Sequence, residues 1–362
     1  MISVFSRRFN HIDKKHVNIC LKSNWISSNG PYSKKLSKKI KSLFDANVSF
    51  VSSGTAAIEC ALNAVNVKKG DEVIIPSFTI VSCLNTVLRL GAKPVIIDVN
   101  KKTWLPNEED IVKKINKKTK AILVVHSFGN CVNVLKLKKL INNKKIKIIE
   151  DCAEAFGAKI GNILAGTMGD ISTFSFYANK TITAGEGGMV ITKNKDFFLR
   201  VEKYKNLFFG KKERFNHEEI GFNYRMTDLQ AALAFSQFLQ YKKNIDIMEK
   251  NVRIYKKFLN TENIEFQKIN TKCKNVWWMF AFVLKKHKAS DLMNYLKKNN
   301  IDSRNLFKPL DKMKFYKKKT GIRSKNSEYL YKQGLYIPSG YDLSISQIKK
   351  VCKICNNFFK KN

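Results

Sequence analysis

Short runs of apolar and β-branched residues alternate with segments of helical periodicity between about residues 50 and 195. The candidate strands are residues 72–75, 94–98, 121–125, 146–150, 171–176 and 189–192. A helix that begins at Ser53-Gly54-Thr55 carries apolar residues at helical spacing, and a second helix spans about residues 107–115. Strands that alternate with helices form a largely parallel sheet with helices on both faces. The sequence therefore predicts an α/β fold.

The pattern changes after residue 226. Thr227 and Gln230 form a capping-box pattern that opens a helix over residues 229–239, and this helix continues to about residue 259. Beyond residue 260 the pattern predicts a strand at 276–283, a helix at 290–298 and loops. We therefore expect a large domain over residues 1–245 and a smaller C-terminal α+β domain over residues 246–362.

The charge is strongly positive, with 67 Lys+Arg against 29 Asp+Glu. One interpretation is binding to nucleic acid or to a membrane surface. The other is a solvated basic surface, of the kind that an AT-rich genome favours through Lys and Asn. The lysines are spread over the chain as pairs and triplets, and no Arg-rich arm or zinc finger accompanies them. The pattern favours the second interpretation, with no specific nucleic-acid partner.

Eight cysteines are scattered as single residues, except for the pair Cys352 and Cys355. A lone CxxC is weak support for zinc or redox work. This pair lies in an apolar-periodic C-terminal segment, so we expect a helix that buries the thiols, and no metal site. The sequence shows no signal-peptide pattern and no apolar run of transmembrane length. These features predict a soluble cytoplasmic protein, of a host cell if the source is viral.

Two stretches carry groups suited to an anion or a cation. The segment SSGTAA at residues 52–57 leads small residues into a helix start, where free backbone N–H groups bind anions. A plain helix cap explains it equally well.

The apolar run at 146–150 ends in Glu150 and Asp151, and ligands lie beyond the carboxyl ends of such strands. A carboxylate there needs a cationic partner or acts as an N-cap, and both interpretations stay open.

Two later stretches could complete a site. Lys180 follows a predicted strand and precedes the glycine-rich segment 185–188. Desolvation would lower the pKa of such a lysine and make it a nucleophile, although most lysines are surface charges. Asn223 and Arg225 lie in the loop before the capped helix, where they contact an anion or shape a turn.

Together these stretches resemble the DegT/DnrJ/EryC1/StrS family of sugar aminotransferases, a branch of the fold-type I enzymes that use pyridoxal phosphate. The motifs that carry the resemblance are SSGTAA, GDEVIIPSFT, EDCAEAFGA, GDISTFSFYANKTITAGEGGM and GFNYRMTDLQAA. The resemblance extends from residues 25–31 to residues 335–339. The segment WISSNGPY, the EDCAEA variant and residues 276–279 are most similar to the perosamine-synthase type. The resemblance implies a seven-stranded, mixed but mostly parallel sheet.

The resemblance also implies roles for residues at the cofactor. Lys180 matches the lysine that holds pyridoxal phosphate covalently and shuttles the proton, and Asp151 matches the carboxylate that pairs with the ring nitrogen. The phosphate cradle corresponds to Gly54, Thr55 and Ser175. The remaining matches are Glu154 near the ring hydroxyl, Ile80 where relatives carry a stacking aromatic residue, and Asn223, which reaches the phosphate of the neighbouring subunit. A homodimer with shared active sites follows.

The substrate side is less specific. Trp277, Trp278 and Arg304 lie in regions that in relatives face the nucleotide sugar. His126 follows a predicted strand and either lines the site or makes a structural hydrogen bond. Asp311 follows Pro309 and Leu310 where relatives tend to have His, which would alter the sugar preference if that His contacts substrate.

The resemblance implies transfer of an amino group from L-glutamate to C4 of a 4-keto-6-deoxyhexose linked to GDP or dTDP, as in perosamine or viosamine synthesis. One alternative is an aminotransferase for a 3-keto sugar nucleotide or a cyclitol. A more distant one is a non-catalytic regulatory or nucleic-acid-binding relative. A related dehydratase branch carries histidine in place of the lysine, so Lys180 favours amino transfer.

Overall fold

A seven-stranded sheet forms the centre of the computed structural model, which describes residues 1–142, 145–210, 213, 215–316 and 323–361. In spatial order its strands are β2 (Asn47–Val51), β10 (Gly188–Thr192), β9 (Ile171–Ser175), β6 (Lys147–Asp151), β5 (Thr119–Val125), β3 (Glu72–Pro76) and β4 (Lys93–Ile97). Neighbours from β9 to β4 run parallel, whereas β10 is antiparallel to both β9 and β2. The mixed, mostly parallel sheet is confirmed.

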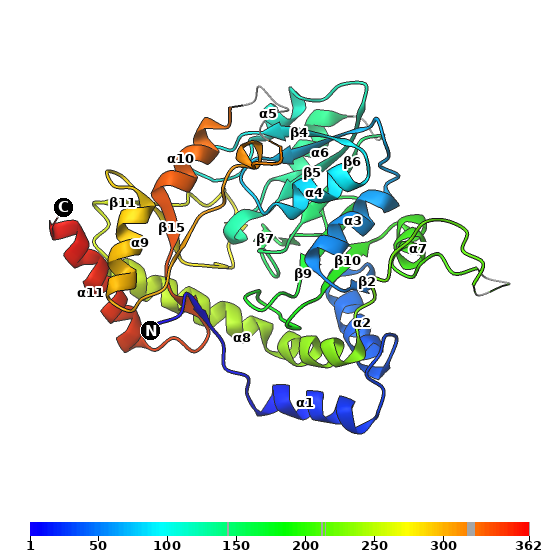
Figure 1. The fold of residues 1–362 in the computed structure, drawn as a ribbon, viewed down its shortest axis with the longest axis horizontal. Helices are drawn as coiled ribbons and strands as arrows, with labels where there is room; N and C mark the ends of the chain where they lie inside the picture. Colours follow the sequence, from blue (N-terminus) through cyan, green and yellow to red (C-terminus); the bar gives the residue numbers. More distant parts are fainter. Residues whose placement is uncertain (143–144, 211–212, 214, 317–322, 362) are drawn as a thin grey trace.

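Alternate residues of the central strands pack on opposite faces of the sheet, as the strand period of two requires. Ile75, Leu123 and Ile149 face a core formed with α3 (Gly54–Ala64), α4 (Ser82–Arg89) and α7 (Lys195–Tyr204). Ile74 and Ile122 belong to the opposite core, formed with α5 (Glu108–Val112) and α6 (Val134–Ile141). Because both faces are covered (Figure 1), the middle residues of these strands are apolar on both faces.

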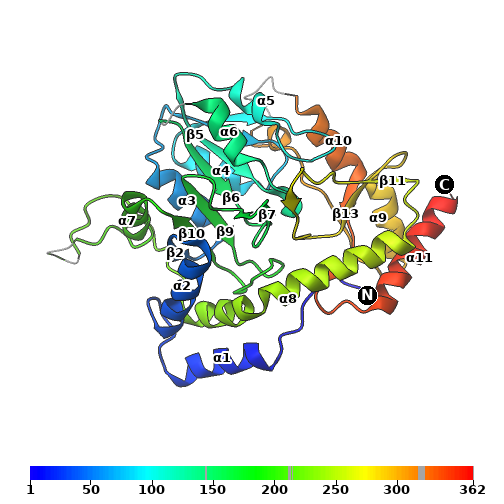
Figure 2. The same cartoon turned by 180° about the vertical axis from the view of Figure 1, so that it is seen from behind.

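One long helix, α8 (Asp228–Phe258), joins the large sheet to the rest of the molecule (Figures 1 and 2). Its capping box is present, with Thr227 accepting from the Gln230 N–H. It packs against α1 (His11–Lys22), α2 (Pro31–Phe44) and α11 (Ile345–Lys361). The expected domain boundary at 245/246 falls within this helix and stays a prediction.

A smaller antiparallel sheet forms the second core. Its strands, in spatial order, are β11 (Ile264–Phe266), β13 (Ala281–Leu284), β15 (Gly334–Tyr336) and β14 (Arg304–Asn305). The helices α9 (Ala289–Lys298), α10 (Lys325–Gln333) and α11 accompany it. The short strand β1 (Phe5–Ser6) pairs with β16 (Ser339–Gly340), and β12 (Cys273–Lys274) pairs with β7 (Lys159–Ile160), which also pairs with β8 (Ile163–Leu164). The expected smaller α+β part is confirmed.

Two sequence expectations were wrong in extent. The strand expected at 276–283 begins only at Ala281, because Trp277 has a left-handed backbone (φ +51) and its N–H bonds to Asn275 Oδ1 at 2.5 Å, which turns the chain. The helix expected at 107–115 covers only Glu108–Val112. The sequence reading also missed β2, an edge strand of the large sheet.

The two cysteines of the CxxC pair are buried in α11, as expected. Burial raises the pKa of the Cys352 thiol to about 12 and raises that of Cys355 further. Such thiols stay protonated and pack as small apolar groups. Across the described residues, no helix combines the length and the apolar character that crossing a membrane requires.

Candidate active site

A cavity of about 350 Å³ lies at the carboxyl ends of the central strands, between the large sheet and the smaller one. Ligands of open α/β sheets bind at this edge because the strand ends and helix N-termini converge there. The large part contributes Gly54, Thr55, Ile80, Asp151, Glu154, Ser175 and Lys180 to its wall. The other part contributes Trp278, Phe307 and Tyr336. Eight of the twelve residues singled out in the sequence therefore meet in one place.

Lys180 presents a buried amine to this cavity. Its side chain is 12% exposed, and its Nζ lies 3.5 Å from Glu154 Oε1 and 3.9 Å from the centre of the Trp278 ring. Burial lowers the pKa of Lys180, while the charges of Glu154 and Asp151 oppose that effect. Desolvation therefore brings the amine closer to the unprotonated form, which is the nucleophile.

Asp151 is buried where β6 ends. One carboxylate oxygen accepts the Ala153 N–H at 3.0 Å, and the other has, among the described residues, only the weak Cys83 thiol donor at 3.7 Å. Burial raises the pKa of Asp151. A buried carboxylate with so little compensation favours a cationic partner in the adjoining space.

Glu154 lies on the same wall and is also buried. Its Oε2 accepts the Phe128 N–H at 2.8 Å. Burial raises the pKa of Glu154 to about 7, although the charge of Lys180 acts to lower it. Glu154 can therefore gain or lose a proton near neutral pH, which is where a general acid or base is effective.

The N-terminus of α3 forms one end of the cavity. Ser53 caps the helix by accepting the Ala56 N–H at 3.1 Å, and the first N–H groups of a helix have no partner within it. A Cβ on Gly54 would lie 2.8 Å from the Ser175 Cβ, so only glycine allows this close approach. The hydroxyls of Thr55 and Ser82 lie 2.8 Å apart beside it. Free N–H groups and hydroxyls suit a phosphate.

Four residues singled out in the sequence do not line the cavity, and three of them have partners elsewhere or lie exposed. Trp277 packs into the core of the smaller sheet, with Lys256 Nζ 4.7 Å from its ring centre. Arg304 lies on β14, and its guanidinium pairs with the Asp302 carboxylate. Asn223 is exposed in a segment that pairs with Asn206, so it is free to reach another subunit.

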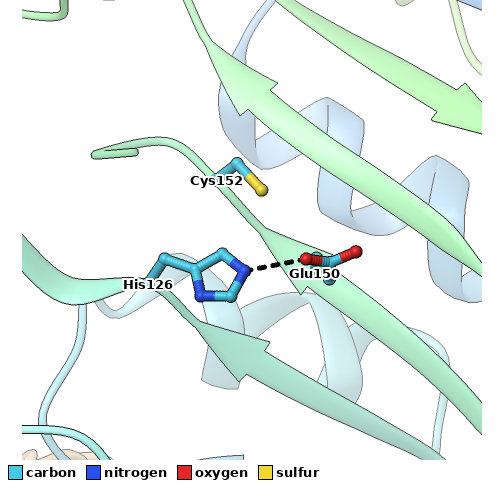
Figure 3. A group of neighbouring side chains, drawn as sticks. All are labelled: His126, Glu150 and Cys152. Carbon is cyan, nitrogen blue, oxygen red and sulfur yellow. Dashed lines mark hydrogen bonds and ion pairs between the residues drawn. The ribbon is translucent and has the colours of Figure 1, made fainter. Parts of the chain in front are cut away.

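His126 is the fourth, and Figure 3 shows its ring turned toward Glu150. Its Nδ1 accepts the Val132 N–H at 3.1 Å, so Nε2 carries the proton and donates it to Glu150 at 2.9 Å. Glu150 also accepts the Gly166 N–H at 2.9 Å. His126 and Glu150 lie close to Cys152, but both ring nitrogens are already bonded. The structural hydrogen bond, one of the two interpretations left open, is what the structure shows.

The sequence reading missed several residues of the wall. Phe307 and Tyr336 come from the smaller part of the molecule; Tyr336 falls in the segment 335–339 where the resemblance ends, but neither residue was given a role. Burial raises the pKa of Tyr336 to about 12, so its hydroxyl keeps its proton. Asn179 precedes Lys180 in one of the family motifs, but no role was expected for it; its buried Oδ1 has no hydrogen-bond partner among the described residues. Its position next to Lys180 was the one available signal.

Comparisons with known proteins agree with this geometry. A model of the DegT/DnrJ/EryC1/StrS aminotransferase family matches residues 9–356. The GDP-perosamine synthase of Escherichia coli O157:H7 is 36% identical over 360 residues, which cover 99% of this chain and 98% of that protein. The chain belongs to the DegT/DnrJ/EryC1/StrS aminotransferase family. It is a sugar aminotransferase of that family, and its cofactor is pyridoxal phosphate.

One further relative and one solved structure with the same fold accompany this match. The GDP-perosamine synthase of Vibrio cholerae is 33% identical over 366 residues, covering 99% of both chains. The aminotransferase TlmJ from Streptoalloteichus hindustanus has the same fold, with a TM-score of 0.94 over 100% of this chain and 99% of its own at 21% identity. The expected fold-type I architecture of this DegT/DnrJ/EryC1/StrS member is confirmed.

Proposed function

We propose that this aminotransferase moves an amino group from L-glutamate to C4 of a nucleotide-linked 4-keto-6-deoxyhexose, with Lys180 as the residue that holds the cofactor. The observation that carries the proposal is the buried Lys180 amine, which faces a cavity between Glu154 and the Trp278 ring. The chain is also similar over nearly its whole length to two GDP-perosamine synthases. Transfer at C3 is the alternative that the experiment must separate.

The residues present fit pyridoxal phosphate at three points. The N-terminus of α3, with Thr55 and Ser175, suits the phosphate, and the missing Cβ of Gly54 brings the helix close to Ser175. The poorly compensated Asp151 carboxylate suits a protonated ring nitrogen. The apolar Ile80 side chain, 46% exposed, covers cavity space where a flat ring would lie.

Pyridoxal phosphate, when bound, supplies an electron-withdrawing ring and a carbon that an amine can attack. Asp151 would hold a proton on the ring nitrogen, because a buried anion stabilises the cation beside it. Lys180 would hold the cofactor through its Nζ and, as a free amine, would carry the proton to and from the reacting carbon. Glu154, with its pKa near 7, holds a proton next to Lys180 at 3.5 Å.

The substrate would occupy the side of the cavity formed by Trp278, Phe307 and Tyr336. Apolar ring faces suit a deoxysugar, and the Tyr336 hydroxyl offers a donor. Arg304 on β14 pairs with Tyr336 on β15, so it lies next to this wall of the cavity. Its guanidinium would then contact the diphosphate of the nucleotide. Asn223 would complete the phosphate site of a partner subunit in a homodimer.

The test is mass spectrometry of the products after incubation with pyridoxal phosphate, L-glutamate and a panel of sugars. The panel contains GDP- and dTDP-linked 4-keto-6-deoxyhexoses and a 3-keto sugar nucleotide, and Lys180→Ala is the control. We expect one 4-keto sugar to gain an amino group with wild type alone. Amination of the 3-keto sugar instead would replace the C4 assignment. A product with Lys180→Ala would overturn the role of Lys180.

A further inference from the structure

Arg7, directly after β1, reaches the backbone of the residue that carries the site. Its guanidinium donates to the carbonyl oxygen of Lys180 and, at 3.4 Å, to that of Thr181. Another nitrogen of the same group donates to the side-chain oxygen of Gln237, on α8. The Lys180 side chain faces the cavity, whereas its carbonyl faces Arg7. Arg7 therefore holds Lys180 from the side opposite to the chemistry.

The hydrogen-bond partners of Arg7 are neutral, the Tyr341 side chain among them, while the charges of Asp13 and Asp342 act on it from farther away. The described residues give it no carboxylate within ion-pair distance, and its buried Nε has no hydrogen-bond partner. Its guanidinium lies 4.6 Å from the ring centre of Tyr341, and burial lowers its pKa. A guanidinium cation in such surroundings makes strong, charge-assisted hydrogen bonds. Because the guanidinium group is rigid and planar, it fixes the directions of these bonds.

Among the described residues, Arg7 is the donor to the carbonyl oxygen of Lys180, and the rest of this loop has its own anchors. The Lys180 N–H bonds to the Tyr177 carbonyl at 3.0 Å, which makes a tight turn after β9, and the Trp278 indole donates to the Asn179 carbonyl at 3.1 Å. The Thr181 side chain bonds to Tyr341, and the Thr183 hydroxyl donates to the Phe176 carbonyl at 3.1 Å. The carbonyls of Lys180 and Thr181 depend on groups from distant elements, of which the guanidinium is the charged one.

We propose that Arg7 is a positioning residue that fixes the backbone of Lys180, so that the amine meets the cofactor in the productive orientation; this rests on the proposed role of Lys180. Arg7 is itself held by the pairing of β1 with β16 and by the Tyr341 ring. The geometry of the lysine thus depends on contact between the N-terminal strand and the small-sheet part of the molecule.

The experiment measures how fast the cofactor-free protein captures pyridoxal phosphate covalently. Samples are quenched with borohydride at timed intervals, and the mass of the peptide containing Lys180 is read. Arg7→Met removes the donors and keeps the length of the side chain. Arg8→Met is the matched control, because Arg8 is exposed and has no hydrogen-bond or ion-pair partner among the described residues. Thermal melting without cofactor and the pH titration of the visible absorbance band accompany each variant.

We expect capture by Arg7→Met to be about tenfold slower or more, with a shifted titration of the visible band, because the orienting hydrogen bonds are lost. Arg8→Met should match wild type. If Arg7→Met fails to fold, Arg7→Lys takes its place, since one ammonium keeps the charge but cannot span the three acceptors. Capture and titration equal to wild type in the folded variant would show a purely structural role, even if melting falls, and would overturn the proposal.

Lys180→Ala separates this failure from failure of the proposed function. If wild type and Lys180→Ala trap the same amount of cofactor, the role of Lys180 is wrong and the inference about Arg7 is overturned with it. If Lys180→Ala traps none while Arg7→Met behaves as wild type, only the inference about Arg7 fails.

Discussion

Three ionisable side chains at the cavity are shifted by the same burial in different directions. Burial raises the pKa of Asp151 and Glu154 and lowers that of Lys180. Each shift favours the neutral form, because a low-dielectric site penalises charge of either sign. Burial thus opposes charge on all three side chains, and a cationic ring would find the Asp151 carboxylate with few hydrogen-bond donors.

Glu154→Gln tests the pKa of about 7 at Glu154. An unfolded glutamate titrates near pH 4.3, so between about pH 4.3 and 7 the unfolded chain ionises while the folded one keeps its proton, and stability falls. The variant has no carboxyl group at this position, so its stability lacks this dependence on pH. We expect the free energy of unfolding of wild type, relative to the variant, to fall by about 3 kcal/mol from pH 4.5 to pH 8. Denaturant unfolding of cofactor-free protein measures it, and parallel pH curves would contradict the raised pKa.

Asp151→Asn should lower turnover about 100-fold or more while the protein still binds pyridoxal phosphate, because a neutral amide stabilises a ring cation poorly. Steady-state kinetics and the visible spectrum provide the two readouts. Cys83→Ala, which removes only the weak thiol contact to Asp151, is the control and should change turnover little. Near-normal turnover in Asp151→Asn would remove Asp151 from the chemistry.

The sequence could place Lys180, Asp151 and Ser175 because each follows or ends a strand, and parallel strands end at one edge. Phe307 and Tyr336 were out of reach, since their approach depends on how the second sheet sits against the first. Trp277 and Trp278 could not be distinguished either. A left-handed backbone at Trp277 sends the two rings to different cores, and no pattern of neighbouring residues encodes that.

At the scale of elements, the proposed phosphate site depends on the junction of α3 with β9. The strands that were recognised are buried on both faces, so their apolar runs are continuous. The missed β2 lies at the sheet edge, where a run of five residues including Asn47 and Ser49 gives a weaker signal. The predicted starts of α3 and α8 agree with the structure because their N-caps, Ser53 and Thr227, are encoded locally.

Gly54→Ala tests this junction. The new Cβ would lie 2.8 Å from the Ser175 Cβ, so α3 must move away from β9. We expect affinity for pyridoxal phosphate to fall about tenfold or more, because the anion site loses its spacing. Fluorescence titration of the cofactor-free protein measures it. Ser53→Ala, which weakens the helix cap without adding bulk at Ser175, should lower stability by about 1 kcal/mol and affinity far less. Equal losses in the two variants would point to helix stability alone.

At the scale of the whole molecule, the exposed Asn223 predicts that two chains build each site. Lys180→Ala and Asn223→Ala would each be impaired alone. After mixing and subunit exchange, a heterodimer carries one site with both defects and one with neither, so about a quarter of wild-type activity should return. Activity is measured before and after exchange, with each variant exchanged against itself as the control. No recovery would mean that Asn223 does not contribute to the active site of the partner subunit.

The pairing of β1 with β16 also sets an order of events during synthesis. Ser6 donates to Asp342, a contact that spans 336 residues, so the first strand emerges from the ribosome long before its partner exists. Contacts of such long range close late and slow the final step of folding. The large sheet can assemble earlier, because all seven of its strands lie between residues 47 and 192. A nascent chain would thus carry a nearly complete sheet whose lysine loop still lacks its last support.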